Sequence, residues 1–136
     1  MKNHNILFVL TLALALTVAA CGNSVGVPDL KGTSWLLVEI NGQPVLDGSA
    51  PTLVFENESV GGNGSCNAFG GEYTTENGKL AFSSIFSTLM YCEDTMDQET
   101  AYFAALEEAV GYQVKDGNLQ LLNADGQVSL SFVPQN

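Results

Sequence analysis

Three cysteines are the residues of this 136-residue chain whose type and spacing could do chemistry. Cys66 stands in a glycine-rich stretch from Gly61 to Tyr73 (GGNGSCNAFGGEY), Cys92 follows further along, and Cys21 ends an apolar N-terminal run. A cysteine in a glycine-rich loop can be a nucleophile, a metal ligand or half of a disulfide. The neighbours of each cysteine and the compartment that the chain reaches decide among these roles.

The N-terminus has the pattern of an export signal with a modification site at its end. Residues 6–16 are almost wholly apolar, a length typical of a signal peptide. The ending Val18-Ala19-Ala20-Cys21 resembles the lipobox of bacterial lipoproteins. We therefore expect residues 1–20 to be a lipoprotein signal peptide and Cys21 to be the lipidation site. The alternative is an ordinary secretory signal with a chance cysteine.

This processing site sets the predicted domains and location. Residues 21–33 are rich in Gly, Ser and Pro and are predicted to be a flexible tether, with a folded domain over residues 34–136. Two or three acyl chains at Cys21 would hold the protein stably on a membrane, in the cell envelope. Gly22 follows the cysteine, which favours the outer membrane if the host is Gram-negative.

The predicted mature chain contains no histidine and no arginine, because the one histidine is His4. This composition excludes Ser-His-Asp and Cys-His catalysis, zinc sites that contain histidine, and bidentate arginine clamps. Carboxylates remain for acid–base work, but they cluster where a helix is predicted to begin, and acids are expected there anyway. The candidates are Glu93, Asp94, Asp97 and Glu99. We therefore expect no enzymatic activity, no metal and no cofactor.

Cys66 and Cys92 remain once Cys21 carries lipid, and in an exported domain two such cysteines most simply form a disulfide. A nucleophilic thiol needs a nearby base or cation to lower its pKa, and the neighbours of Cys66 include no cation. Free thiols, catalysis and metal binding are the alternatives. A bond that closes a loop of about 26 residues would stabilise the domain by roughly 3 to 4 kcal/mol.

The charge balance is strongly acidic, with four basic residues, all lysines, against 15 Asp and Glu, and a formal net charge of −11. An acidic surface repels phosphate, so no nucleic-acid partner is expected. Electrostatic attraction to anionic lipid is disfavoured for the same reason. The membrane is therefore expected to be a partner through the lipid at Cys21.

The domain is predicted to be mostly β. Apolar runs and turn signals such as Asn77-Gly78 predict extended segments. These are Ser34–Ile40, Pro51–Phe55, Ser59–Val60, Ala68–Tyr73, Leu80–Phe86, Thr88–Tyr91, Tyr112–Lys115, Leu119–Leu122 and Val128–Val133. Alternation in the last segment predicts one buried and one wet face, which is typical of an antiparallel sheet.

One helix is predicted over residues 95–110. Thr95-Met-Asp-Gln98 fits a capping box, and the apolar stripe comprises Met96, Phe103, Leu106 and Val110. Glu99 is interpreted as a carboxylate near the positive helix end, with a polar group pointing into a pocket as the alternative. The fold class is α+β, mainly β: a curved antiparallel sheet or small barrel with one helix packed on it.

The order of motifs resembles the META domain, the family of the heat-shock protein HslJ. The resemblance rests on Thr33-Ser-Trp35, Gly64-Ser-Cys-Asn67, Ser87-Thr-Leu-Met-Tyr-Cys92, the segment Met96–Glu99, and the closing strands. Its motif residues are Trp35, Gly64, Cys66, Asn67, Gly70, Tyr73, Thr88, Met90, Cys92 and Glu99, and we interpret them as structural. One departure is Ala68-Phe69, because the family more often has a basic residue after Cys-Asn.

The resemblance implies a lipocalin-like barrel topology and an extracytoplasmic, often lipid-anchored protein linked to stress or drug tolerance. It brings no catalytic mechanism. The expected function is therefore binding of an envelope protein or of another lipoprotein. The alternative is a carrier of a small apolar ligand in a groove between sheet and helix, lined by Phe82, Phe86, Tyr102 and Phe103.

Overall fold

The computed structural model describes residues 27–136, which contain nine strands and one helix. The predicted signal peptide and Cys21 lie outside the described residues. The elements are β1 Ser34–Ile40, β2 Gln43–Pro44, β3 Thr52–Phe55, β4 Ser59–Asn63, β5 Ala68–Glu76, β6 Lys79–Ser87, α1 Met96–Glu108, β7 Gly111–Lys115, β8 Asn118–Leu122 and β9 Val128–Pro134.

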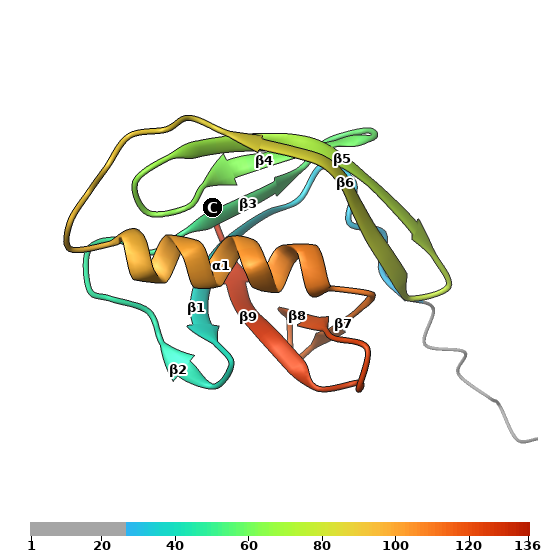
Figure 1. The fold of residues 1–136 in the computed structure, drawn as a ribbon. Coiled ribbons are helices and arrows are strands. Elements are labelled where there is room, and N and C mark those ends of the chain that lie inside the picture. Colours follow the sequence, from blue (N-terminus) through green and yellow to red (C-terminus); the bar gives the residue numbers. More distant parts are fainter. Residues whose placement is uncertain (1–26) are drawn as a thin grey trace, which may run out of the picture.

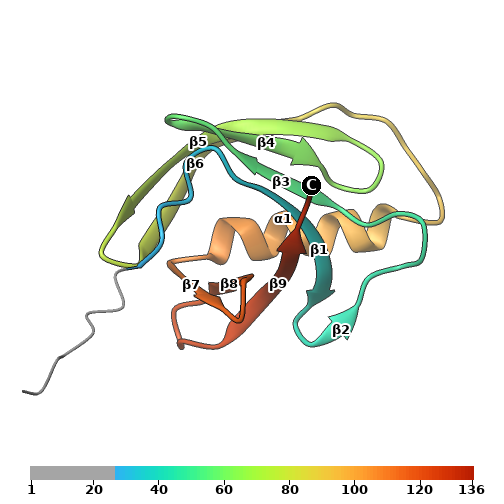
Figure 2. The same ribbon diagram turned by 180° about the vertical axis from the view of Figure 1, so that it is seen from behind.

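The strands form one antiparallel sheet that curves into a ring, with α1 lying across it (Figure 1). The order is β2-β1-β3-β4-β5-β6-β7-β8-β9, and β1 also pairs with β9, which closes the ring. Figure 2 shows the side of the ring where β1 and β9 lie next to each other. The predicted α+β, mainly β fold with a curved antiparallel sheet and one packed helix is confirmed.

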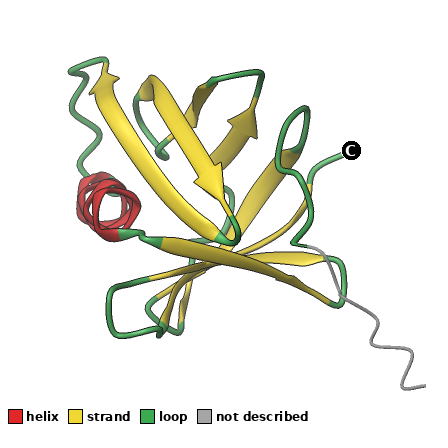
Figure 3. Cartoon of the chain, turned by 90° about the vertical axis from the view of Figure 1, so that its right-hand side faces the viewer, coloured by secondary structure: helices red, strands yellow, loops and turns green. Residues whose placement is uncertain are grey.

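The ring has one weak seam. β5 and β6 pair at seven positions, whereas β6 and β7 pair at Lys79↔Gly111 alone. Seen end-on in Figure 3, the helix lies beside the sheet, and a loop connects it to the neighbouring strand. We call this connection, residues 88–95, the β6–α1 loop.

The core is filled by side chains from the inner face of the ring and from the buried face of the helix. Tyr102 is fully buried and its ring lies 5.9 Å from that of Phe69 and 6.4 Å from that of Phe132, both edge-on. Such edge-to-face contacts are favourable for aromatic rings. Leu30, 1% exposed, belongs to the same core, so the folded part includes a residue that the sequence analysis assigned to the tether.

The hairpin turns follow the sequence signals. Asn77 and Gly78 both have positive φ, 50° and 80°, which is the backbone that an Asn-Gly two-residue turn requires. The segment 88–91, predicted to be extended, is not a strand, because β6 ends at Ser87. The helix is shorter than predicted and ends at Glu108, after which Ala109 is extended and Val110 is 49% exposed.

The capping-box prediction is wrong. Thr95 is the N-cap residue but makes no side-chain capping bond, and its buried Oγ1 has no hydrogen-bond partner. Its amide instead donates to the Cys92 carbonyl at 3.1 Å, so the Gln98 side chain is not needed there. Gln98 bonds distant loops: its Oε1 accepts from the Leu46 amide and its Nε2 donates to Ser65 Oγ. Long-range contacts thus replace the local cap.

Candidate functional site

The middle and later family motifs meet at the start of α1, where Asn67 links three segments of the chain. Its Nδ2 donates to the Met90 carbonyl at 3.0 Å and to Glu99 Oε1 at 2.5 Å. Its Oδ1 accepts from Thr88 Oγ1 and from the Met90 amide, both at 2.7 Å. Both donor hydrogens and both lone pairs of the amide are therefore used. Asn67 fixes the β6–α1 loop to the glycine-rich loop.

Glu99 is a buried carboxylate, 3% exposed, on the first turns of α1. Its Oε2 accepts from the amides of Cys66 at 2.8 Å and Asn67 at 2.6 Å. The helix N-terminus also favours a negative charge here. The alternative interpretation of Glu99, a polar group that points inward, thus agrees with the structure, in which Glu99 holds the glycine-rich loop against the helix.

The contact between the glycine-rich loop and Glu99 also explains why residue 64 is a glycine. A Cβ at this position would lie 2.6 Å from Phe103 Cζ and 2.8 Å from Glu99 Oε2. Any larger residue would push the loop away from the carboxylate that accepts its amides. The glycine is thus required by close approach, because its backbone must lie against the helix.

Cys66 and Cys92 form a disulfide with a Cα–Cα distance of 5.9 Å, as predicted. The bond joins the same two loops that Asn67 connects. The glycine-rich loop and the end of the β6–α1 loop are therefore tied together both covalently and by hydrogen bonds. The disulfide leaves no free thiol among the described cysteines for nucleophilic chemistry.

Above this rigid base the chain exposes four large apolar side chains. Leu89 is 96% exposed, Tyr91 78%, Phe86 69% and Met90 57%. Three of them are consecutive in the β6–α1 loop, and Phe86 lies at the end of β6. Scattered exposed apolar residues are ordinary, but Leu89, Met90 and Tyr91 are consecutive and line one hollow.

A cavity of about 370 Å³ lies between the β6–α1 loop and the first turns of α1. Its apolar lining residues are Leu89, Met90, Tyr91, Met96 and Phe103. Asn67 and Glu99 contribute polar groups. The predicted site residues Asn67, Thr88, Met90 and Glu99 thus lie around one hollow.

The remaining family residues lie elsewhere. Trp35 is buried and its Nε1 donates to Thr33 Oγ1 at 2.7 Å. Tyr73 is buried and its hydroxyl donates to the Glu56 carbonyl at 2.8 Å. Burial, and then the charge of Asp29, raise the pKa of Tyr73. A Cβ on Gly70 would lie 2.8 Å from Phe86 Cζ.

The candidate catalytic carboxylates do not converge. Asp94 and Asp97 line a groove of about 550 Å³ beside β1 and β2, whereas Glu99 faces the cavity on the other side of the helix start. Glu93 is exposed. Within residues 27–136 no group of three or more His, Cys, Asp or Glu is arranged to hold a metal ion.

The aromatic residues of the predicted carrier groove do not share a cavity. Tyr102 is fully buried, and Phe82 and Phe103 pack against the core. Phe103 lines the cavity beside the β6–α1 loop, and none of the other three does. Tyr102, Phe82 and Phe103 therefore contribute mainly to packing, whereas Phe86 is 69% exposed.

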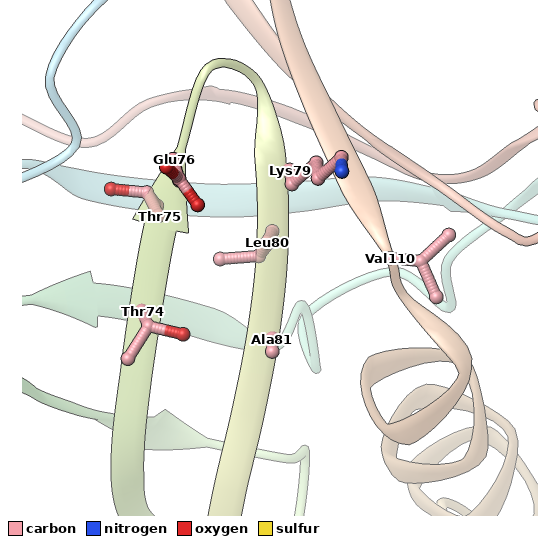
Figure 4. Close-up of a pocket in the computed structure, with 7 residues that line it drawn as sticks. All are labelled: Thr74, Thr75, Glu76, Lys79, Leu80, Ala81 and Val110. Atoms are coloured by element: carbon pink, nitrogen blue, oxygen red, sulfur yellow. The ribbon is translucent and has the colours of Figure 1, made fainter.

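A further hollow of about 530 Å³ lies at the seam of the ring. Figure 4 shows Leu80 and Ala81 on one strand of the β5–β6 hairpin and Val110 across from them. It contains none of the family motif residues. In the described part of the chain no helix is long and apolar enough to cross a membrane.

Gln98 and Ser65 also hold this region together, and the sequence did not predict that role for either residue. Gln98 Nε2 donates to Ser65 Oγ at 2.8 Å, and Ser65 Oγ donates to the Ser49 carbonyl at 2.9 Å. Ser65 also has a φ of 118°, which is unusual for a residue other than glycine. Because Gln98 fitted a local capping pattern, no sequence signal pointed to its distant partners.

The comparisons with known proteins agree with this arrangement. The model of the META domain family matches residues 28–136. A protein from Burkholderia xenovorans solved by NMR is 27% identical, with a TM-score of 0.64, over 79% of this chain and 84% of that one.

A DUF4847 family protein from Bacteroides vulgatus shares the fold at 13% identity, with a TM-score of 0.62, over 79% of this chain and 96% of that one. A search of curated proteins found no match. Since the family model covers nearly all of the folded part, the chain belongs to the META domain family.

Proposed function

We propose that this protein is a lipid-anchored member of the cell envelope that works without catalysis, by binding another envelope protein or lipoprotein. The observation that carries the proposal is the exposed apolar group Phe86, Leu89, Met90 and Tyr91 on a rigid base. A surface that is already ordered loses little conformational entropy on binding. The role in stress or drug tolerance is part of the proposal and rests on family membership.

The position of the β6–α1 loop is compatible with an anchor at Cys21. Val27, the first described residue, lies beside the β5–β6 turn: a Cβ on Gly78 would be 3.4 Å from Val27 Cγ2. The β6–α1 loop begins at the other end of the nine-residue β6, about 26 Å away at the usual strand rise. In Figure 1 the loop and the start of the described chain lie at opposite sides. A protein anchored at Cys21 can therefore turn the exposed loop towards a partner.

Site-specific photo-cross-linking in intact cells tests the binding role. A photoreactive amino acid replaces Leu89 in the full-length chain, and the control replaces Leu46, which is 49% exposed on another loop. We expect a discrete protein adduct from position 89 that is absent from position 46 and is lost in Tyr91→Ser. Identical adducts from both positions, or adducts with lipid alone, would contradict the proposal.

The anchor is tested separately. The wild-type chain should fractionate with membranes and incorporate labelled palmitate, and Cys21→Ser should do neither because the acceptor thiol is gone. Membrane association that persists unchanged in Cys21→Ser would show that lipid at this residue does not hold the protein. Loss of drug or heat tolerance in Tyr91→Ser, but not in Leu46→Ser, would connect the loop to the physiological role.

A further inference from the structure

The cavity beneath the β6–α1 loop combines an apolar wall with a buried carboxylate. Met90, Met96 and Phe103 line its sides, and Glu99 lines it from the helix. Unbranched thioether side chains adapt well to a flexible aliphatic chain. The hollow therefore presents apolar side chains together with one carboxylate.

The carboxylate of Glu99 retains capacity for another donor. It accepts three hydrogen bonds, two at Oε2 and one at Oε1, all from neutral N–H groups of Cys66 and Asn67. A carboxylate has about four acceptor positions. A buried charge is most stable when an opposite charge accompanies its hydrogen bonds. The described partners of Glu99 satisfy hydrogen bonding but supply no opposite charge.

We propose that this cavity receives a lysine side chain of a partner protein. The four methylenes pack against Met90, Met96 and Phe103, and the ammonium group donates to the Glu99 carboxylate. Tyr91, 78% exposed in the lining, offers its ring to the same cation. The inference rests on the proposed binding function and names the element of the partner that is recognised.

Lysine fits this hollow better than arginine. An ammonium group is a compact charge on a flexible stem, and one direct bond to the carboxylate leaves two donors for nearby oxygens or water. A guanidinium group carries five N–H donors in a rigid fork, and an already bonded carboxylate cannot accept a bidentate pair. The fork would lose hydration without full replacement.

A partner other than a second copy of this chain is favoured by charge. The sequence has a net charge of −11, so two copies repel each other, whereas a basic segment is attracted and its encounter accelerated. The described lysines are Lys31, Lys79 and Lys115, and none of them lines the cavity.

Methionine methyl signals provide a direct test, because the chain contains three methionines and two of them line the cavity. The full-length chain, labelled with ¹³C-methyl methionine and held in detergent micelles, is titrated with the peptide acetyl-Gly-Ser-Val-Lys-Val-Ser-Gly-amide. Matched peptides carry norleucine, acetyl-lysine or arginine in place of lysine. We expect saturable shifts of the Met90 and Met96 signals with the lysine peptide.

The two uncharged peptides should bind at least about tenfold more weakly, because they lack the charged hydrogen bond, and the arginine peptide should also bind more weakly. Raising the salt concentration should weaken binding of the lysine peptide. Tyr91→Ser should reduce affinity several-fold, whereas Leu46→Ser, outside the cavity, should not. Both side chains are exposed, so neither substitution removes packing from the core and both variants should fold.

Equal shifts with norleucine or acetyl-lysine, equal binding of the arginine peptide, or no shift at all would overturn the inference. Concentration-dependent shifts without peptide would also overturn it, in favour of self-association. If the peptide fails while the Leu89 cross-link to a protein persists, the lysine site is wrong and the binding function stands. If both fail, both proposals fall.

Discussion

At the scale of single residues, Asn67 and Glu99 decide the shape of the site. Each is nearly inaccessible to solvent, 2% and 3% exposed, and each uses its side chain to hold backbone groups of distant segments. Buried polar groups are tolerated when their hydrogen bonds are made, and are costly when one partner is lost. These two residues therefore stabilise the site more than their size suggests.

Asn67→Asp replaces the side-chain NH₂ group by an oxygen and so tests how far the site depends on the hydrogen bonds that this group donates. The new carboxylate would face the Glu99 carboxylate and the Met90 carbonyl, where Nδ2 now donates. We expect a loss of about 3 kcal/mol or more in the free energy of unfolding, since an unpaired buried charge is introduced. Urea denaturation at pH 7 measures it. Asn123→Asp, at a half-buried position in the turn between β8 and β9, is the control and should change stability by less than about 1 kcal/mol, because its side-chain oxygen still accepts the amides of Asp125 and Gln127.

At the scale of elements, the start of α1 shows how tertiary contacts replace a local signal. The Thr95 hydroxyl is buried without a partner, and the Thr95 amide donates to the Cys92 carbonyl. Thr95→Val should therefore stabilise the protein by roughly 1 kcal/mol, because it removes an unsatisfied buried hydroxyl.

A working capping box would give the opposite sign, a loss of roughly 1 kcal/mol. Thermal and urea unfolding of Thr95→Val therefore distinguish the two arrangements directly. Thr100→Val on the exposed part of the same helix should stay within about 0.5 kcal/mol of the wild type. Destabilisation by Thr95→Val would mean that the hydroxyl does cap the helix.

The disulfide ties the β6–α1 loop to the glycine-rich loop across a sequence separation of 26 residues. Replacing both cysteines by alanine should lower the free energy of unfolding by roughly 3 kcal/mol, because the unfolded chain gains freedom. Hydrogen exchange should increase in residues 88–95 before it increases in β8 and β9. Dithiothreitol should destabilise the wild type and leave the double variant unchanged, and an insensitive wild type would refute the stabilising role.

At the scale of the whole molecule, a buried tyrosine in the aromatic core makes the free energy of unfolding decrease at alkaline pH. Burial raises the pKa of Tyr102 well above its usual value of 10.0, because the ionised phenol would lose its hydration. The folded state thus retains the proton that the unfolded state releases. This stability is fully present below pH 10 and is lost as the pH rises above 10 towards the raised pKa.

Tyr102→Phe should flatten this decline, since the buried ring can no longer ionise. It should also cost about 1 kcal/mol at neutral pH, because the phenol donates to the Thr52 carbonyl at 3.1 Å. Denaturant midpoints measured from pH 7 to pH 11 test both effects. Tyr91, 78% exposed, supplies the control: Tyr91→Phe should retain the wild-type pH profile.

The sequence predicts those parts of the fold that depend on local chemistry. Asn77-Gly78 specifies its hairpin because few residue pairs accept two positive φ angles. Cys66 and Cys92, the two cysteines outside the predicted signal segment, suggested their own pairing. In contrast, the closure of β1 onto β9 and the hydrogen bonds of Glu99 to Cys66 and Asn67 depend on segments far apart in the chain. No window of sequence contains both partners, so periodicity and capping rules could not predict them.

Because β6 and β7 share a single residue pair, the ring of strands has a mechanically weak opening between them. A force applied across this opening is resisted by the Lys79↔Gly111 pair and the two backbone hydrogen bonds that flank it, whereas β1 and β9 resist it with five residue pairs. Under mechanical or thermal stress, β6 and β7 should therefore separate first, while β1 and β9 stay paired and act as the hinge.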